Sequence, residues 1–226
     1  MLLSTIVADE LRLLAFRRPS PAISLHFGAY LVFGLFFTWL AGVGRYWDNP
    51  KAYWWQSLGL GSLAYVFVLA LLVWVLLGPL RPKNWSYRSV LLFITLTAPP
   101  AVLYAIPVEK FMTVDAARTA NAWFLGIVAS WRVALFAVYL FRVSRLEAGA
   151  VIVATLLPLA IIVVALSVLN LEHVVFDLMS GIREEDRSSA DTAYTVVFVL
   201  SMFSFFASPF LIVGYLWYMY RAWRGA

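Results

Sequence analysis

Hydrophobic residues in this chain gather into long runs, and polar residues are confined mostly to the short stretches between them. A transmembrane helix needs about 20 mostly apolar residues, and six runs reach or approach that length. These runs are residues 23–43, 58–80, 90–107, 122–141, 148–171 and 193–220. The pattern predicts an all-α polytopic membrane bundle of about six transmembrane helices, formed by one domain over residues 1–226.

Prolines interrupt two of the predicted spans. The third span is short and carries Pro99 and Pro100 near its middle, so we expect it to be broken or kinked. A broken span lines a cavity in many transporters, but it is also a common structural kink, and no matching break elsewhere supports the transporter pattern. The sixth span has 28 residues, which predicts a tilt or a kink at Pro209.

The N-terminal arm, residues 1–20, has a different pattern from the spans. Its apolar face would consist of Leu3, Ile6, Val7 and Leu14, and its polar face of Thr5, Asp9 and Arg12. Such a helix rests in the membrane interface, with its polar face in water. We therefore predict an interfacial amphipathic helix on the cytoplasmic side. Asp9 and Glu10 interrupt the apolar run, which argues against a cleaved signal peptide.

Composition supports the same class. Hydrophobic residues make up 63% of the chain and charged residues 13%, whereas a soluble domain is about half apolar and a quarter charged. Ordinary soluble domains and disordered chains are therefore excluded. The chain has no cysteine, so thiolate metal sites and cysteine nucleophiles are excluded as well. The net charge of +5 is better explained by membrane topology than by nucleic-acid binding.

The placement of charges predicts the orientation. If the N-terminus is inside, the inner segments hold ten basic and three acidic residues, and the outer segments hold six basic and nine acidic ones. Lys and Arg are enriched in cytoplasmic loops. Both termini are therefore predicted to be cytoplasmic, and the compact chain suggests the cytoplasmic membrane of a bacterium.

Arg132 is the basic residue placed in the middle of a predicted span. Arginine at the bilayer centre costs about 3 kcal/mol on insertion scales, so its guanidinium should face protein or water. We expect it to contact a carbonyl or hydroxyl of the third or fifth span, with Thr95 and Thr97 as candidates. Three roles remain open at this point: a structural tie between helices, a site for an anion or lipid phosphate, and a contact with a partner subunit.

A second polar group lies on the predicted outer side. It consists of Glu109, Glu172, His173 and Asp177. His173 and Asp177 are four residues apart and would share a helix face, so the group could bind a metal or perform acid–base chemistry. A solvated interfacial helix has the same composition, and the other histidine, His26, is predicted on the opposite side. No metal and no cofactor are expected.

The order of these features is similar to that of the bacterial branch of the Yip family of multi-pass membrane proteins. The similarity is carried by FRRPSPA at residues 16–22, LTAPPAVLY at 96–104, WRVALFAVYL at 131–140 and EAGAVIVATLLPL at 147–159. The family usually has five spans, one fewer than predicted here. The resemblance implies a scaffold that organises membranes or assists trafficking, and it implies no particular functional residues.

Three functions remain open. No phosphate-binding loop, dinucleotide fingerprint or hydrolase motif is present. The first hypothesis is therefore a non-enzymatic scaffold, membrane organiser or accessory subunit that contacts lipid and a membrane-protein partner or a second copy. The second is a small transporter or channel with a site at Arg132. The third is an intramembrane enzyme acting on lipid, which rests only on the outer polar group.

Overall fold

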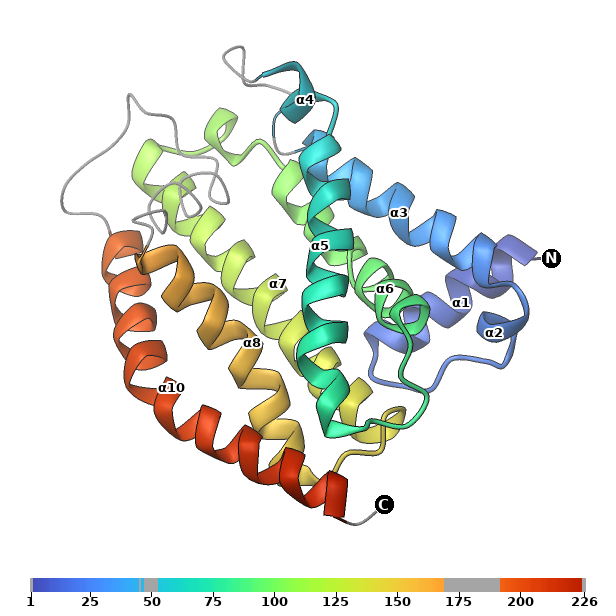
Figure 1. Ribbon diagram of the computed structural model, residues 1–226. Coiled ribbons are helices and arrows are strands. Elements are labelled where there is room, and N and C mark those ends of the chain that lie inside the picture. Colours follow the sequence, from blue (N-terminus) through green and yellow to red (C-terminus); the bar gives the residue numbers. More distant parts are fainter. Residues whose placement is uncertain (1, 45, 47–52, 169–191, 225–226) are drawn as a thin grey trace.

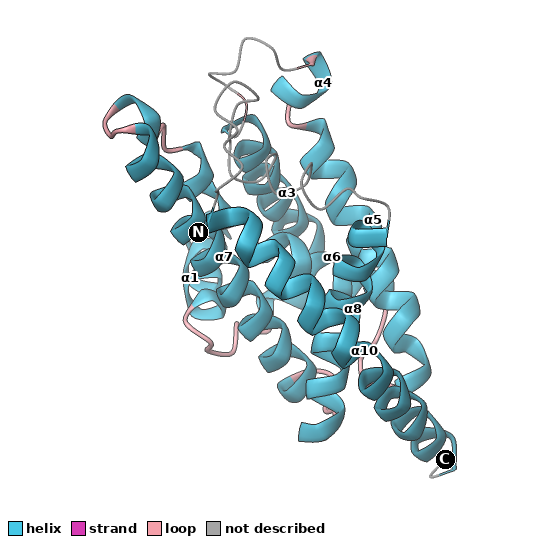
Figure 2. Ribbon diagram, turned by 90° about the vertical axis from the view of Figure 1, so that its left-hand side faces the viewer, coloured by secondary structure: helices cyan, strands magenta, loops and turns pink. Residues whose placement is uncertain are grey.

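The computed structural model describes residues 2–44, 46, 53–168 and 192–224, and over these ranges the chain forms helices joined by loops, with no strand (Figures 1 and 2). The helices are α1 (Leu2–Leu14), α2 (Ala22–Leu25), α3 (Phe27–Gly44), α4 (Trp54–Ser57), α5 (Leu60–Leu77), α6 (Tyr87–Leu96), α7 (Val114–Arg142), α8 (Ala148–Val168) and α10 (Thr192–Arg224). Short 3₁₀ helices are η1 (Gly78–Leu80), η2 (Pro99–Ala105) and η3 (Val108–Lys110).

Five helical segments are long and apolar enough to cross a membrane, or six when one bent pair is counted as a span. The five are Phe27–Gly44, Leu60–Leu80, Thr119–Arg142, Ala148–Ala165 and Val199–Arg224. They correspond to five of the runs found in the sequence. The bent pair, α6 with η2, corresponds to the remaining run.

The break predicted at the paired prolines is present. Helix α6 begins with a reciprocal cap, in which the Ser86 side chain accepts from the Ser89 amide and the Ser89 hydroxyl accepts from the Ser86 amide. Neither Pro99 nor Pro100 has an amide hydrogen to continue the α-helical pattern. The chain therefore changes to a 3₁₀ helix, and η2 is bent by 44° relative to α6.

The predicted faces of the N-terminal helix are found only in part, since Ile6 is buried and Arg12 is exposed as the pattern indicates. Asp9 and Glu10 are on the buried face of α1, and Leu3 and Leu11 are exposed. Helix α1 lies beside α6 and the first part of α3 (Figure 1). In hydrocarbon surroundings an apolar face can point outward while carboxylates find donors inside. Asp9 and Leu3 therefore lie on the opposite sides from those predicted, and the interfacial position of the helix remains a prediction.

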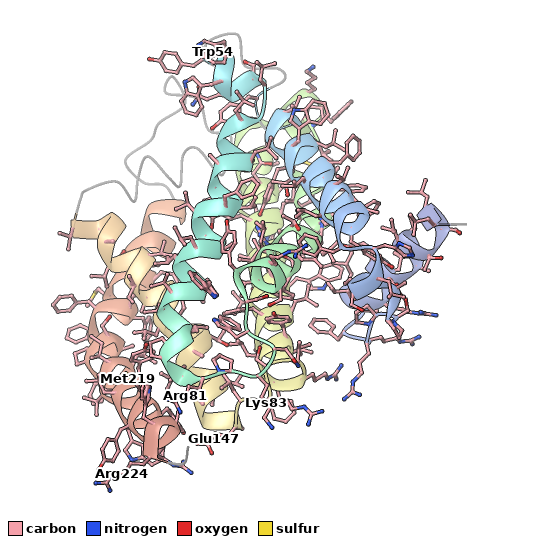
Figure 3. All side chains as sticks on the ribbon, turned by 45° about the vertical axis from the view of Figure 1, so that its right-hand side comes forward. Trp54, Arg81, Lys83, Glu147, Met219 and Arg224 are labelled. Atoms are coloured by element: carbon pink, nitrogen blue, oxygen red, sulfur yellow. The ribbon has the colours of Figure 1, made fainter. Side chains whose placement is uncertain are left out.

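Basic residues gather at one end of the bundle. Figure 3 shows Arg81, Lys83 and Arg224 there, with Trp54 at the opposite end. Arg81 lies 4.0 Å above the ring of Trp223. Arg221 pairs with Glu147 at 2.8 Å. This grouping in space matches the segments that the charge pattern places inside.

Candidate functional site

Arg132 is half-buried on α7, with buried apolar side chains one turn before and one turn after it. On α7 it is four residues after Val128 and three before Leu135, and both of these side chains are buried. Its Nε donates a hydrogen bond of 3.3 Å to the Thr97 hydroxyl, which in turn donates to the Ile94 carbonyl at 2.8 Å. The structure therefore brings Arg132 to a hydroxyl of the third span, at the point where α6 ends.

Thr95 is not part of this contact. Its hydroxyl donates to the Leu92 carbonyl at 2.9 Å, within its own helix. The side chain faces α3, where a Cβ added to Gly34 would lie 2.7 Å from the Thr95 Cβ. Gly34 is needed there because any side chain would hold α3 and α6 apart. Thr95 is a packing residue between these two helices.

Helix α1 is held against α7 close to Arg132. Trp131 donates from its indole Nε1 to the Leu14 carbonyl at 2.9 Å, and Arg142 donates to the Phe16 carbonyl. These two carbonyls belong to the end of α1, where orphan acceptors need partners. Ile6 packs with Leu96 of α6 at the other end of the helix. Asp9 and Glu10 lie between these two attachments, on the buried side.

Asp9 is the anchor of the buried face. Its Oδ1 accepts from the Ser20 amide at 2.9 Å and from Arg12 at 3.2 Å. Its Oδ2 accepts from the Ser20 hydroxyl at 2.5 Å and from the Tyr30 hydroxyl at 2.6 Å. Burial raises the pKa of Asp9, but the hydrogen bonds from Ser20, Tyr30 and Arg12 outweigh it, so the pKa falls below its ordinary value. Asp9 is therefore ionised and joins α1, the loop before α2, and α3.

Glu10 is buried without such support. Its side chain is 4% exposed, and neither carboxylate oxygen has a hydrogen-bond partner. Burial raises the pKa of Glu10 to about 8, because an ionised carboxylate is poorly solvated there. Two adjacent carboxyl groups thus differ in state, with Asp9 ionised and Glu10 neutral at neutral pH.

Two separate polar groups are candidates for a site. The first is the pair of carboxyl groups on α1, in which Asp9 is anchored by hydrogen bonds and Glu10 is unsatisfied. The second is Arg132 with Thr97, where a guanidinium meets a hydroxyl. A carboxyl group can bind a proton, and a guanidinium can bind an anion. Among the described residues no three His, Cys, Asp or Glu side chains come together for a metal ion.

The outer polar group has no described geometry. Glu172, His173 and Asp177 lie outside the described residues, and for Glu109 the structure describes only the backbone, in η3. The metal or acid–base reading of these residues remains a prediction.

Sequence reasoning found Arg132 and Thr97 but missed Asp9 and Glu10 as interior groups. The available signal was the acidic pair itself, in a helix otherwise rich in leucine, isoleucine and valine. Thr95 was grouped wrongly with Thr97, because residues two apart on a helix point about 200° away from each other. That spacing already separates the two threonines.

Comparisons with known proteins add no family to this description. No family model, no curated protein and no solved structure matches the chain.

Proposed function

We propose that this chain is a multi-pass protein of the bacterial cytoplasmic membrane and acts as an accessory subunit or organiser rather than as an enzyme. The observation that carries the proposal is the exposure of α10. Within its apolar window, Val199–Arg224, 6% of the residues are buried, against 44% in the window of α8. A membrane helix with so little packing in its own chain has most of its surface available to a partner.

Large aromatic side chains are exposed along α10. They include Phe203, Phe205, Phe206, Phe210, Trp217 and Trp223, beside the aliphatic Leu200 and Val213. On its other side α10 packs against α8, where Ser201 and Ser167 are joined by a hydrogen bond of 2.8 Å. Figure 2 shows the face of the molecule that α8 and α10 form, with both helices toward the viewer. Aromatic residues are enriched at protein interfaces, because they bury large areas with few rotatable bonds.

The position of the charges supports the proposed orientation. The basic end of the bundle contains both the loop after η1 and the end of α10, which an even number of spans places on the same side as the N-terminal arm. The positive-inside rule then assigns this end to the cytoplasm. The resemblance to the bacterial Yip branch is a further reason to favour an organiser over an enzyme.

Photo-crosslinking tests the proposal. A benzophenone amino acid at Phe203 or Phe210, in native membranes, should give a discrete adduct of higher mass. Matched positions on α5 are Val68 and Val75, which are 65% and 58% exposed and should give none. An adduct of twice the chain mass would identify a second copy as the partner. No adduct from either helix, or equal adducts from both, would assign the α10 surface to lipid and contradict the proposal.

A small transporter is the second candidate, and the contact between Arg132 and Thr97 favours it. This contact places a fixed positive charge beside a broken span, and broken spans bind substrates in several transporter folds. If α10 gives no crosslinks, the accessory-subunit proposal is contradicted and the transporter is favoured.

A further inference from the structure

Among the described residues, Glu10 is the buried carboxyl group whose side chain forms no hydrogen bond and no ion pair. Asp9, its neighbour, accepts four hydrogen bonds and attaches α1 to α3. Glu10 accepts none, although both of its oxygens are buried. An ionised carboxylate in such a place is disfavoured, because no contact described here compensates for the loss of its hydration.

The basic groups on α1 and on the helices that pack with it have other partners. On its own helix Arg12 pairs with Asp9. From α6, Arg88 lies over the ring of Phe27, 4.4 Å from its centre.

The basic groups of α7 bind other acceptors too. Arg132 donates to Thr97 and Arg142 to the Phe16 carbonyl. Arg17 and Arg18, in the connection after α1, are exposed. The titratable group that α3 contributes nearby, the Tyr30 hydroxyl, donates to Asp9. Among the described residues, none of these groups forms an ion pair or hydrogen bond with Glu10.

The surroundings of Glu10 favour a proton over a metal cation. Ile6, one turn earlier on α1, packs with Tyr30, Leu92 and Leu96. Leu13, three residues later, packs against the same cluster. A cation of the calcium or magnesium type needs six or more oxygen ligands, and no cluster of carboxylates or histidines offers them among the described residues. A proton needs only the carboxyl itself.

We propose that Glu10 is a proton-binding site and that its proton holds α1 in the bundle. With the proton bound, the neutral carboxylic acid is accommodated between Ile6 and Leu13. When the O–H bond breaks, the proton passes to water and a carboxylate with no counter-ion remains between α1 and the bundle. That charge is relieved when α1 leaves its packing against α6 and α7, so α1 reports the proton concentration to the rest of the domain. Burial, which raises the pKa of Glu10 to about 8, places the transition near physiological pH.

Two measurements on the full-length protein in lipid nanodiscs test this proposal. The first is labelling by dicyclohexylcarbodiimide, which reacts with protonated carboxyl groups in apolar surroundings. Peptide mass spectrometry should find Glu10 labelled below about pH 8 and progressively less labelled above it. Failure to label Glu10 at any pH would overturn the proposal.

The second measurement follows the position of α1. The chain has no cysteine, so spin labels can be attached to cysteines introduced at Leu3 and Ile127, both exposed. The distance distribution should show one population at low pH and a second, longer one as the pH rises past about 8. Glu10→Gln should keep the first population at every pH, whereas Glu147→Gln, at an exposed ion pair, should behave like the unchanged protein. An equal pH response in Glu10→Gln would contradict the proposal, and so would a constant distance in the unchanged protein.

Discussion

Asp9→Ala is expected to lower the free energy of unfolding by about 3 kcal/mol, because hydrogen bonds to a charged acceptor are each worth about 1.5–3 kcal/mol and their loss leaves buried donors unsatisfied. The substitution removes the acceptor of the Tyr30 hydroxyl and of both the hydroxyl and the amide of Ser20. Tyr30 is 1% exposed and has no access to water. Unfolding in mixed micelles, followed by circular dichroism, measures this change.

The matched control is Glu147→Ala, which removes a carboxylate from an ion pair with Arg221 that is half exposed on both sides. Exposed ion pairs contribute about 0.2–1 kcal/mol, so this variant should be nearly neutral. The pH dependence adds a second check. Because folding lowers the pKa of Asp9, the contribution of Asp9 to stability is complete above pH 3.8. It is lost as the pH falls through the lowered pKa. Equal effects of the two variants would show that Asp9 is not the anchor of α1.

Glu10→Gln is expected to stabilise the protein at alkaline pH and to leave it unchanged in acid. Burial raises the pKa of Glu10 in the folded protein from 4.5 to about 8. Between these values the folded chain carries a proton that the unfolded chain has lost, so stability falls as the pH rises. The slope from this group is about 1.4 kcal/mol per pH unit. Glutamine does not titrate, so the variant should lack this part of the slope.

Chemical unfolding at several pH values between 4.5 and about 8 measures the difference. The two proteins should have the same stability at the acidic end and diverge steadily toward the alkaline end. Parallel pH profiles would mean that Glu10 is solvated or paired in the folded protein. A variant less stable than the unchanged protein at every pH would mean that the carboxyl makes a necessary hydrogen bond.

The long apolar helices and the position of the break between α6 and η2 could be predicted from the sequence, because both depend on local composition. Pro99 and Pro100 have no amide hydrogen to continue the hydrogen bonds of a helix. The bend between α6 and η2 lies at these two prolines. The contact of Arg132 with a third-span hydroxyl could also be anticipated. A buried guanidinium needs an acceptor, and few side-chain acceptors exist at that depth.

The packing of α1 could not be predicted from local sequence composition. A hydrophobic pattern identifies two faces of a helix, but which face turns inward depends on the medium outside. Leu3 and Leu11 face outward, which lipid surroundings would favour, and Asp9 finds its donors at Ser20 and Tyr30. These donors come from 11 and 21 residues further along the chain. No local rule joins them to Asp9.

The central claim is that the bent pair of α6 and η2 crosses the membrane and completes a six-span protein. Such a crossing would put Arg132 within the membrane and α1 beside the cytoplasmic half of the bundle. Single cysteines at Trp54, Lys83, Met112 and Arg224, in a chain that has none of its own, test it with a membrane-impermeant thiol reagent on intact cells and inverted vesicles. The account expects Trp54 and Met112 to label from outside, and Lys83 and Arg224 only from inside. Labelling of Met112 and Lys83 from the same side would contradict it, because α6 and η2 would then re-enter the membrane without crossing.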